Sequence, residues 1–236
     1  MNRKQVSAFI QEIGIVPSVR VSSADDARFA TESISQGGIP LVEIAMSVPG
    51  AVQVISALTK SAPRMVIGAG GIPDAETARR CLDAGAKFLT TDALILEVVE
   101  CAKMQDAVVF PGALTPMEVI AAWQAGSDFV KVVPCFAMGG ESYIRYLKTA
   151  LGDVPLIAAG GVSQQNAAGY MVAGATALGI GEALIPWDAV AHRQSSRIRE
   201  LARRFLNFVE TANRENGRKA GHVAANRAPV FALKEA

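Results

Sequence analysis

The sequence repeats one kind of junction four times: a segment with helical spacing ends in a small residue and glycine, and an apolar run begins at once. The four junctions are "ISQGGIPLVEIAM", "CLDAGAKFLTT", "AWQAGSDFVKVV" and "YMVAGATALGIG". Glycine just past a helix adopts the left-handed conformation that other residues resist. The apolar and β-branched runs that follow are typical of parallel strands, which are covered on both faces. The repeat therefore predicts alternating helices and parallel strands.

Apolar runs of this kind predict eight strands, at 15–21, 40–46, 64–69, 87–91, 107–111, 128–133, 154–158 and 176–180. Each is followed by a segment that suits a helix, and a short helix is expected in front, at 2–13. Eight βα units predict an α/β fold of the (β/α)₈ type, a TIM barrel, that spans residues 1–212 as the catalytic domain. An open doubly wound sheet is the alternative. Pro17 is unfavourable inside the first strand because proline lacks a ladder donor.

Two helices have clear start signals. The segment 115–118, Thr-Pro-Met-Glu, is a capping box with proline at the first helical position, and 23–26, Ser-Ala-Asp-Asp, is a weaker version. A long last helix is expected at 189–212, where Ile198, Leu201, Phe205 and Phe208 form an apolar stripe. Residues 213–236 have no clear period. We expect them to form a C-terminal extension, partly disordered or packed on a neighbouring subunit.

Composition limits the possible partners. The chain of 236 residues is 50% hydrophobic and 19% charged with a net charge of +1, which argues against a general attraction to nucleic acid or anionic membranes. Residues 192–236 carry +6 and residues 1–191 carry −5, and the excess is read as a solvated basic helix and tail. No run approaches the roughly 18 apolar residues of a membrane span, and the first residues lack the apolar stretch of a signal peptide. The three cysteines, Cys81, Cys101 and Cys135, lack metal-ligand spacing and are predicted to be reduced thiols of a cytoplasmic protein.

Three ionisable residues lie late in apolar strands, where a barrel of this kind has its active site. They are Arg20, Glu43 and Lys131, the last inside the run Phe-Val-Lys-Val-Val. Arg20 could be an ordinary strand-end charge, and Glu43 and Lys131 could form a buried ion pair. Such pairs only about break even against apolar packing, so stability alone does not account for them.

The chemical interpretation makes use of the same burial. An apolar site disfavours the charged form of a lysine, and the neutral amine attacks carbonyl carbons. A nearby carboxylate can move protons as the carbinolamine forms and breaks down. An arginine offers a planar fork to a substrate carboxylate or phosphate. Together these groups predict Schiff-base chemistry on a keto acid.

Glycine-rich turns follow three of the predicted strands. They are "GAGG" at 68–71, "AAGG" at 158–161 and "GIGE" at 179–182. Without side chains, their backbone N–H groups can approach an anion closely, and the loops after the seventh and eighth strands usually bind phosphate in this fold. Glycine also closes tight turns, so each turn alone is weak evidence.

The residues resemble a known family. "LVEIAMSVPGA", "VIGAGG", "FPGALTPMEV", "FVKVVP", "AAGGVSQQN" and "GIGEALIP" occur in the order and spacing of the bacterial KDPG (2-keto-3-deoxy-6-phosphogluconate) aldolase family. That family includes the 4-hydroxy-2-oxoglutarate and 2-keto-3-deoxy-6-phosphogalactonate aldolases. The resemblance covers about residues 5–210, and its most specific part is the pair of glutamate in "VEI" and lysine in "KVVP".

The resemblance implies a class I aldolase that reversibly cleaves a 2-keto-4-hydroxy acid into pyruvate and an aldehyde. Lys131 would form the Schiff base, and Glu43 would be the general acid/base acting through a water. No metal or other cofactor is implied, and the expected assembly is a homotrimer. The implied substrate-binding residues are Arg20, Ser47, Gly70, Gly71, Thr91, Ala159, Gly160, Gly161, Gly181 and Glu182.

Four of these residues depart from the family's pattern. Many members have threonine in place of Gly71, arginine in place of Ser47, and a threonine linked to discrimination at C4 in place of Ala159. Glu182 stands where a serine commonly helps to bind phosphate. Because a carboxylate repels a phosphate dianion, we hypothesise that the preferred substrate lacks the terminal phosphate, as 4-hydroxy-2-oxoglutarate does.

Two other functions stay open at this point. One is a phosphate-binding isomerase or synthase of the thiamin-phosphate type, which does not require a desolvated lysine opposite a glutamate. The other is a catalytically silent barrel that binds metabolites, which the departures at 71, 159 and 182 would allow. Retention of Lys131 and Glu43 counts against it. His192 and His222 are expected to be surface residues.

Overall fold

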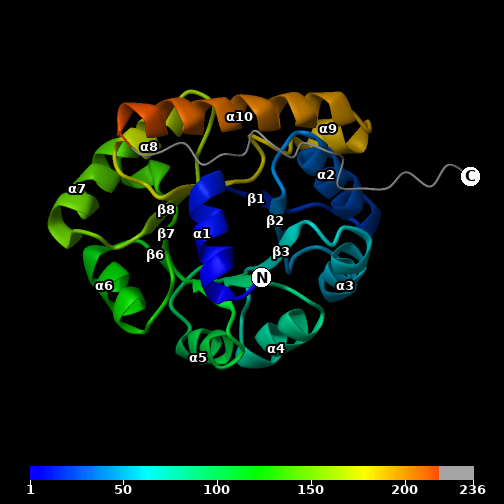
Figure 1. Cartoon of the computed structure of the whole chain (residues 1–236), viewed down its shortest axis with the longest axis horizontal. Helices are drawn as coiled ribbons and strands as arrows, with labels where there is room; N and C mark the ends of the chain where they lie inside the picture. Colours follow the sequence, from blue (N-terminus) through cyan, green and yellow to red (C-terminus); the bar gives the residue numbers. More distant parts are fainter. Residues whose placement is uncertain (218–236) are drawn as a thin grey trace, which may run out of the picture.

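The computed structural model of the chain describes residues 1–217; residues 218–236 lie outside the described part. Helices surround a ring of strands (Figure 1). The strands are β1 (Ile15–Val19), β2 (Leu41–Ala45), β3 (Val66–Gly70), β4 (Phe88–Thr90), β5 (Val108–Phe110), β6 (Gly112–Ala113), β7 (Val130–Val132), β8 (Leu156–Ala159) and β9 (Ala177–Ile180). The helices are α1 (Arg3–Ile13), α2 (Ala24–Gln36), α3 (Ala51–Ser61), α4 (Ala75–Asp83), α5 (Leu96–Met104), α6 (Pro116–Gln124), the 3₁₀ turn η1 (Phe136–Met138), α7 (Glu141–Leu151), α8 (Ala167–Val172), α9 (Trp187–Ala191) and α10 (Ser195–Glu215).

The sheet is parallel and closed. Its order is β5-β4-β3-β2-β1-β9-β8-β7-β6; β5 lies within the strand predicted at 107–111, and β6 continues it just beyond that range. Pro111, which has no N–H to donate, separates β5 from β6, so the nine strands correspond to the eight predicted. β5 pairs with β4 and β6 pairs with β7. The N–H of Lys131 in β7 also donates to the carbonyl of Pro111, the residue between β5 and β6, at 2.9 Å. The predicted (β/α)₈ barrel is confirmed, and the open sheet is excluded.

Strand positions and junctions follow the prediction. All eight predicted strands are present, and Pro17 is kept inside β1, where it pairs with Ile180. One glycine in each of the four junctions has a left-handed backbone: φ is +100° at Gly38, +104° at Gly85, +88° at Gly126 and +107° at Gly174. These positions therefore need glycine for conformational reasons.

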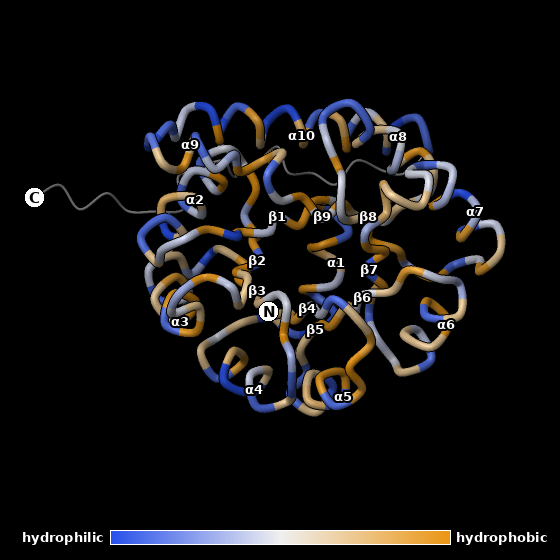
Figure 2. Tube along the Cα trace, turned by 180° about the vertical axis from the view of Figure 1, so that it is seen from behind, coloured by the Kyte–Doolittle hydropathy of each residue, from blue (hydrophilic) through white to orange (hydrophobic). Residues whose placement is uncertain are grey.

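Apolar packing fills the barrel below its carboxyl end. α1 lies across the amino end of the barrel (Figure 1) with Val6, Ile10 and Ile13 buried. Inside, the Phe88 and Phe110 rings stack at 5.3 Å and the Phe129 ring meets Phe110 edge-on at 5.8 Å. Figure 2, which shows the opposite side, has mainly hydrophobic strands inside a ring of helices that mix hydrophobic and hydrophilic residues. The barrel is a packed core with an open end only where the strands finish.

The prediction of one helix at 189–212 is wrong, because two helices, α9 and α10, occupy this region. Between them Arg193 has φ +52°, a left-handed conformation that breaks the helix. Arg193 is held there by ion pairs to Asp25 and to Asp26 of α2 and by its position 4.9 Å over the Phe29 ring. A tertiary contact with α2 thus fixes a break that helical periodicity does not reveal.

The predicted apolar stripe of the last helix is present on α10. Ile198 and Phe205 are buried, and Leu201 and Phe208 lie at its partly buried edges. α10 continues to Glu215, and the rest of the predicted extension, with His222, lies outside the described residues. His192 is exposed at the end of α9.

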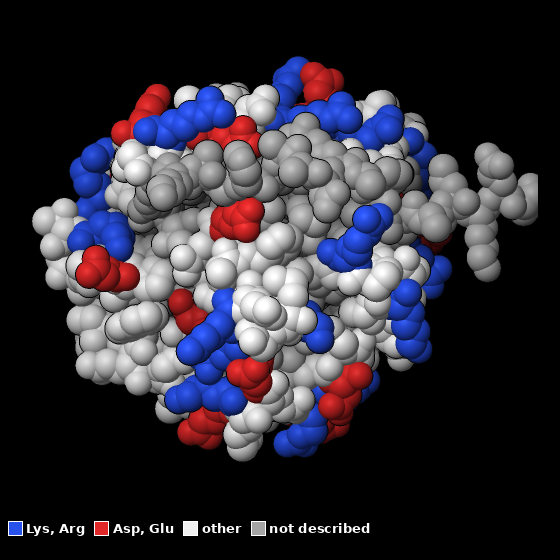
Figure 3. Space-filling view, in the orientation of Figure 1, with Lys and Arg blue, Asp and Glu red and all other residues white. Residues whose placement is uncertain are grey.

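Both predicted helix starts are confirmed. The side chain of Ser23 accepts a hydrogen bond from the N–H of Asp26, and Thr115 and Glu118 form a complete capping box. On the face shown in Figure 3, basic and acidic side chains are interspersed around the rim. Within residues 1–217, no helix is long and apolar enough to cross a membrane.

Candidate active site

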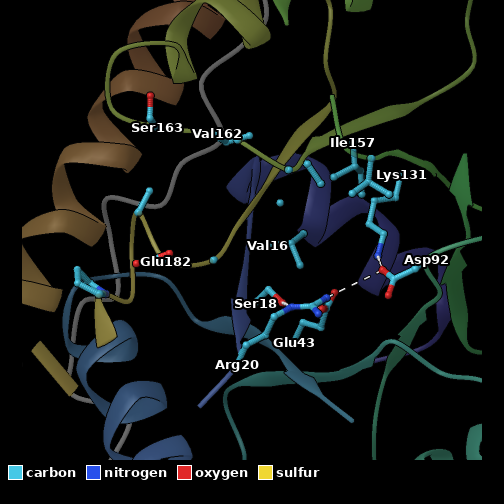
Figure 4. A pocket seen from close by; sticks show the side chains of 18 of the residues that line it. Val16, Ser18, Arg20, Glu43, Asp92, Lys131, Ile157, Val162, Ser163 and Glu182 are labelled. Carbon is cyan, nitrogen blue, oxygen red and sulfur yellow. Dashed lines mark hydrogen bonds and ion pairs between the residues drawn. The ribbon is translucent and has the colours of Figure 1, made fainter. Parts of the chain in front are cut away.

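A cavity of about 800 Å³ opens where the strands end (Figure 4). Its walls come from β1, β2, β7, β8 and β9 and from the loops that follow β1, β4, β8 and β9. The cavity brings together eight of the residues predicted for the site, Arg20, Glu43, Lys131, Ala159, Gly160, Gly161, Gly181 and Glu182. The barrel therefore assembles at one place residues that are far apart in the sequence.

Lys131 projects from β7 into this cavity and is only 6% exposed. In the sheet it lies between Gly112 of β6 and Ile157 of β8. Its Nζ donates to Asp92 Oδ1 at 2.9 Å and to Thr90 Oγ1 at 3.5 Å. The Lys131 amine is thus largely buried, and the carboxylate that it contacts directly is that of Asp92.

Glu43 is more deeply buried, at 3% exposure, and both of its oxygens accept hydrogen bonds from hydroxyls. Ser18, its neighbour in register on β1, donates to Oε1 at 2.8 Å, and Thr90 donates to Oε2 at 2.9 Å. Among the residues that the structure describes, Lys131 forms its ion pair with Asp92 and not with Glu43. The Thr90 hydroxyl instead connects the amine to the Glu43 carboxylate.

Two glycines of the turn after β3 shape this region without lining the cavity. A Cβ on Gly70 would lie 2.1 Å from Glu43 Oε1, so only glycine leaves room for the carboxylate. Gly71 has φ +69°, where a β-branched residue such as threonine would be strained. In this chain both positions have a local structural reason to be glycine.

Asp92 is the residue that the sequence analysis missed. It lies two residues after β4, its side chain is 62% exposed, and its Oδ1 contacts Lys131 Nζ and lies 4.0 Å from Arg20 Nη2. Partial burial raises the pKa of this carboxyl, but the hydrogen bond and charge of Lys131, with the charge of Arg20, outweigh burial and hold its pKa below the usual value. The rule that selected Lys131, an ionisable residue at the end of an apolar strand, could also have selected Asp92.

The wall from β8 and β9, which lie between β7 and β1 in the sheet, combines Ile157 with backbone and small residues. Gly160 and Gly161 have φ of +76° and +89°. A Cβ on Gly160 would lie 2.7 Å from Pro134 Cα, and a Cβ on Gly161 would lie 2.3 Å from Phe136 Cβ. Ala159 presents only a methyl group to the cavity. The chain here is close-packed on its outer side and bare toward the cavity.

The rim of this wall carries charged side chains. Glu182 is exposed and borders both the cavity and an adjoining groove of about 390 Å³. Arg197 lines both spaces as well, and its guanidinium is paired with Asp188 at 2.6 Å. Because Asp188 already balances Arg197, Glu182 leaves this end of the cavity with a negative excess.

Two further predicted residues lie off the cavity wall. Ser47 is exposed in the turn after β2, and Thr91 is buried with its hydroxyl donated to the Ala93 carbonyl. It is the preceding residue, Thr90, whose hydroxyl reaches Glu43. Among residues 1–217, no group of three or more His, Cys, Asp or Glu side chains is placed to hold a metal ion.

Comparison with known proteins agrees with this geometry. The family model described as KDPG and KHG aldolase matches residues 6–201. The 2-dehydro-3-deoxy-6-phosphogalactonate aldolase of Escherichia coli K12 is 27% identical over 201 residues, which cover 84% of this chain and 94% of the relative.

Solved structures share the fold over most of the chain. One is a cube-shaped, highly porous protein cage designed by fusing symmetric oligomeric domains, with a TM-score of 0.79 and 26% identity over 87% of this chain and 75% of that one. Another is KDPG aldolase from Legionella pneumophila with pyruvate captured as a covalent carbinolamine, with a TM-score of 0.78 and 22% identity over 84% of this chain and 96% of that one. With the family model matched over most of its length and the barrel that its members share, the chain belongs to the KDPG and KHG aldolase family.

Proposed function

We propose that Lys131 is the Schiff-base lysine and Glu43 the general acid/base of this chain. Membership of the family makes the protein a class I, pyruvate-dependent aldolase that reversibly cleaves a 2-keto-4-hydroxy acid into pyruvate and an aldehyde. The observation that carries the assignment is the buried Lys131 amine in the cavity, connected to Glu43 through the Thr90 hydroxyl. A carbinolamine of pyruvate in the Legionella relative is the covalent species expected on this route.

The chemistry follows from the geometry. The neutral amine attacks C2 of the keto acid, water leaves, and the resulting iminium accepts the electron pair of the C3–C4 bond as the aldehyde departs. Glu43, fixed by Ser18 and Thr90, is placed to move the protons of the C4 hydroxyl and of C3 through a water. Arg20, half exposed at the end of β1, offers its guanidinium to the substrate carboxylate.

We propose further that the preferred substrate lacks a terminal phosphate. The end of the cavity next to Gly161 and Gly181 carries Glu182 and a neutral Asp188–Arg197 pair. The N–H of Ser163, in the loop after β8, is already donated to Asn166 Oδ1 at 2.7 Å. A dicarboxylic keto acid carries less charge toward this end than a phosphate dianion does, and is therefore repelled less.

We also propose a homotrimer in the cytoplasm, built from one catalytic domain per chain over residues 1–212. The designed cage of symmetric oligomeric domains, which has the same fold, supports an oligomer. Cys81, Cys101 and Cys135 are buried free thiols, in keeping with a reducing compartment. Size measurement in solution tests the assembly, and a monomer would contradict it.

The two other functions considered above require less of the site. A phosphate-binding isomerase or synthase, or a silent metabolite-binding barrel, needs no amine that reacts with pyruvate. The chain is therefore incubated with pyruvate, reduced with borohydride, and analysed by peptide mass. We expect an adduct on Lys131 that is absent from Lys131→Ala. No adduct in the wild-type chain would refute the Schiff-base assignment, and an adduct retained by Lys131→Ala would refute the choice of lysine.

A further inference from the structure

We propose that Asp92 is a second catalytic carboxylate, which carries protons from Lys131 Nζ to the departing oxygen while the Schiff base forms. The inference rests on the proposed Schiff-base function and divides its acid/base work between two residues. Asp92 would act during imine formation, and Glu43 would act at the C3–C4 bond. Nothing in the family resemblance or in the comparisons assigns this position a role.

Contacts at the amine support this division. Asp92 Oδ1 is 2.9 Å from Lys131 Nζ, whereas Glu43 reaches Nζ only through Thr90, whose oxygen is 3.5 Å from the amine. Both Glu43 oxygens also accept hydroxyl hydrogen bonds, from Ser18 and Thr90. Asp92 is therefore the carboxylate in direct contact with the nucleophile.

Exposure separates the two carboxylates in the same way. The Asp92 side chain is 62% exposed at the mouth of the cavity, and Glu43 is 3% exposed. A carboxylate near water can exchange protons with solvent between turnovers. A buried carboxylate fixed by two hydroxyls is suited instead to proton transfer at substrate atoms that the barrel holds in one position.

The atoms of the step balance without any other reactant. The ammonium of Lys131 carries three hydrogens and the iminium carries one, so the two that leave in water both start on Nζ. Asp92 takes the first, the amine forms its bond to C2, and the carbonyl electron pair moves to oxygen, which receives that proton. Asp92 then takes the second and gives it to the hydroxyl as the C–O bond breaks. It ends as a carboxylate beside the cationic iminium.

Arg20 couples this step to substrate binding. The groups that face Asp92 are Lys131 from β7 and Arg20 after β1, with Glu43 of β2 as the other carboxylate of the cluster. Arg20 is one of the cations that favour the ionised form of Asp92. A keto-acid carboxylate bound at Arg20 neutralises that cation, which makes Asp92 a stronger base when substrate is present.

The competing interpretation gives Asp92 a passive role. It would occupy the place between Arg20 and Lys131 until the substrate carboxylate displaces it. Removing Asp92 would then leave imine formation unchanged or faster. The two interpretations predict opposite changes in one measured rate.

The test measures how fast the pyruvate adduct on Lys131 forms, by quenching samples into borohydride at successive times. The variants are Asp92→Asn, which keeps the shape without the charge, and Asp92→Ala, with and without added formate. Asp153→Asn is the matched control, because Asp153 is exposed near the start of β8, at the other end of the barrel. Circular dichroism and thermal unfolding check that each variant is folded.

We expect adduct formation at pH 7 to slow about 100-fold in both Asp92 variants, the usual order for a lost proton-transfer group. Formate should restore at least about tenfold in Asp92→Ala, because a small carboxylate fits the vacated space. Adduct formation at the wild-type rate or faster overturns the proposal. A slow rate that formate does not restore also overturns it, since it marks a positioning role. Absence of the adduct from the wild-type chain would instead refute the Schiff-base function itself.

Discussion

The cavity has two unlike walls (Figure 4). The wall from β1, β2, β4 and β7 carries Glu43 and Lys131, both nearly fully buried, and Asp92, which contacts the amine. The wall from β8 and β9 presents Ile157, the Ala159 methyl group and several glycines, with Glu182 at its rim. We call them the ionic wall and the glycine wall. The charged residues and the glycines thus lie on different strands around the same cavity.

Burial explains why the two walls tolerate different changes. On the ionic wall each charged group depends on a particular partner, because a buried charge or polar group without a partner destabilises the folded protein. On the glycine wall, Gly160 and Gly161 place no side chain in the cavity, and substitutions there are limited by the atoms that pack against the backbone. Substitutions should therefore impair catalysis on the first wall and change preference on the second.

The largest effect is expected from Glu43→Gln on the ionic wall. The amide keeps the size of the side chain but cannot take up a proton, so kcat should fall about 10²–10⁴-fold with the fold retained. Steady-state kinetics and circular dichroism measure both. Glu100→Gln, an exposed change on α5, is the control and should leave kcat near the wild-type value. An unchanged kcat in Glu43→Gln would remove Glu43 from the mechanism.

The same substitution is compared at a glycine packed behind Glu43 of the ionic wall and at a glycine of the glycine wall. In Gly70→Ala the new Cβ meets Glu43 Oε1 at 2.1 Å, whereas at Gly181 the nearest atom is 3.9 Å away. We expect Gly70→Ala to lower the free energy of unfolding by about 1–3 kcal/mol, as overpacking does. Gly181→Ala should stay within about 0.5 kcal/mol of the wild type. Urea denaturation measures both, and equal losses would contradict the difference between the walls.

Glu182→Gln should change preference without abolishing activity. A phosphate dianion about 4 Å from a carboxylate in water-like surroundings loses about 1 kcal/mol per charge. A dicarboxylic substrate carries one charge less at this end, so removing the carboxylate should raise kcat/KM for phosphorylated substrates about fivefold relative to dicarboxylic ones. Glu182→Asp keeps the charge and is the matched control. A wild-type enzyme that already prefers the phosphorylated compound would refute the substrate proposal.

An effect on stability alone is expected at two buried thiols. Burial raises the pKa of Cys81 and of Cys135 to about 11, from a usual value of 9.0. Between about 9 and 11 the unfolded chain loses these protons while the folded chain keeps them. The free energy of unfolding should therefore decrease as the pH rises through this range. Denaturation at pH 8 and pH 10 measures the change, and a more stable protein at pH 10 would contradict the assignment.

The sequence predicted the parts of the site that obey local rules. The junction glycines identified the βα repeat, and the end of an apolar strand identified Lys131, Glu43 and Arg20. Those rules depend on the conformation of one residue or on the burial of one strand, so one segment contains the whole signal. The steric need for Gly70 could not be found this way, because the atom that it avoids belongs to another strand.

Only the tertiary structure decided which groups touch. Asp92, 39 residues from Lys131, forms the ion pair that the sequence alone assigned to Glu43 as one alternative. Thr90, 47 residues from Glu43, fixes that carboxylate instead. The break between α9 and α10 is likewise set by contacts of Arg193 with α2. The sequence by itself determined the barrel and the family and predicted Lys131 as the nucleophile, since periodicity and glycine conformation are local. The partner of each charge depends on how the barrel closes and on strand register, which no single segment contains.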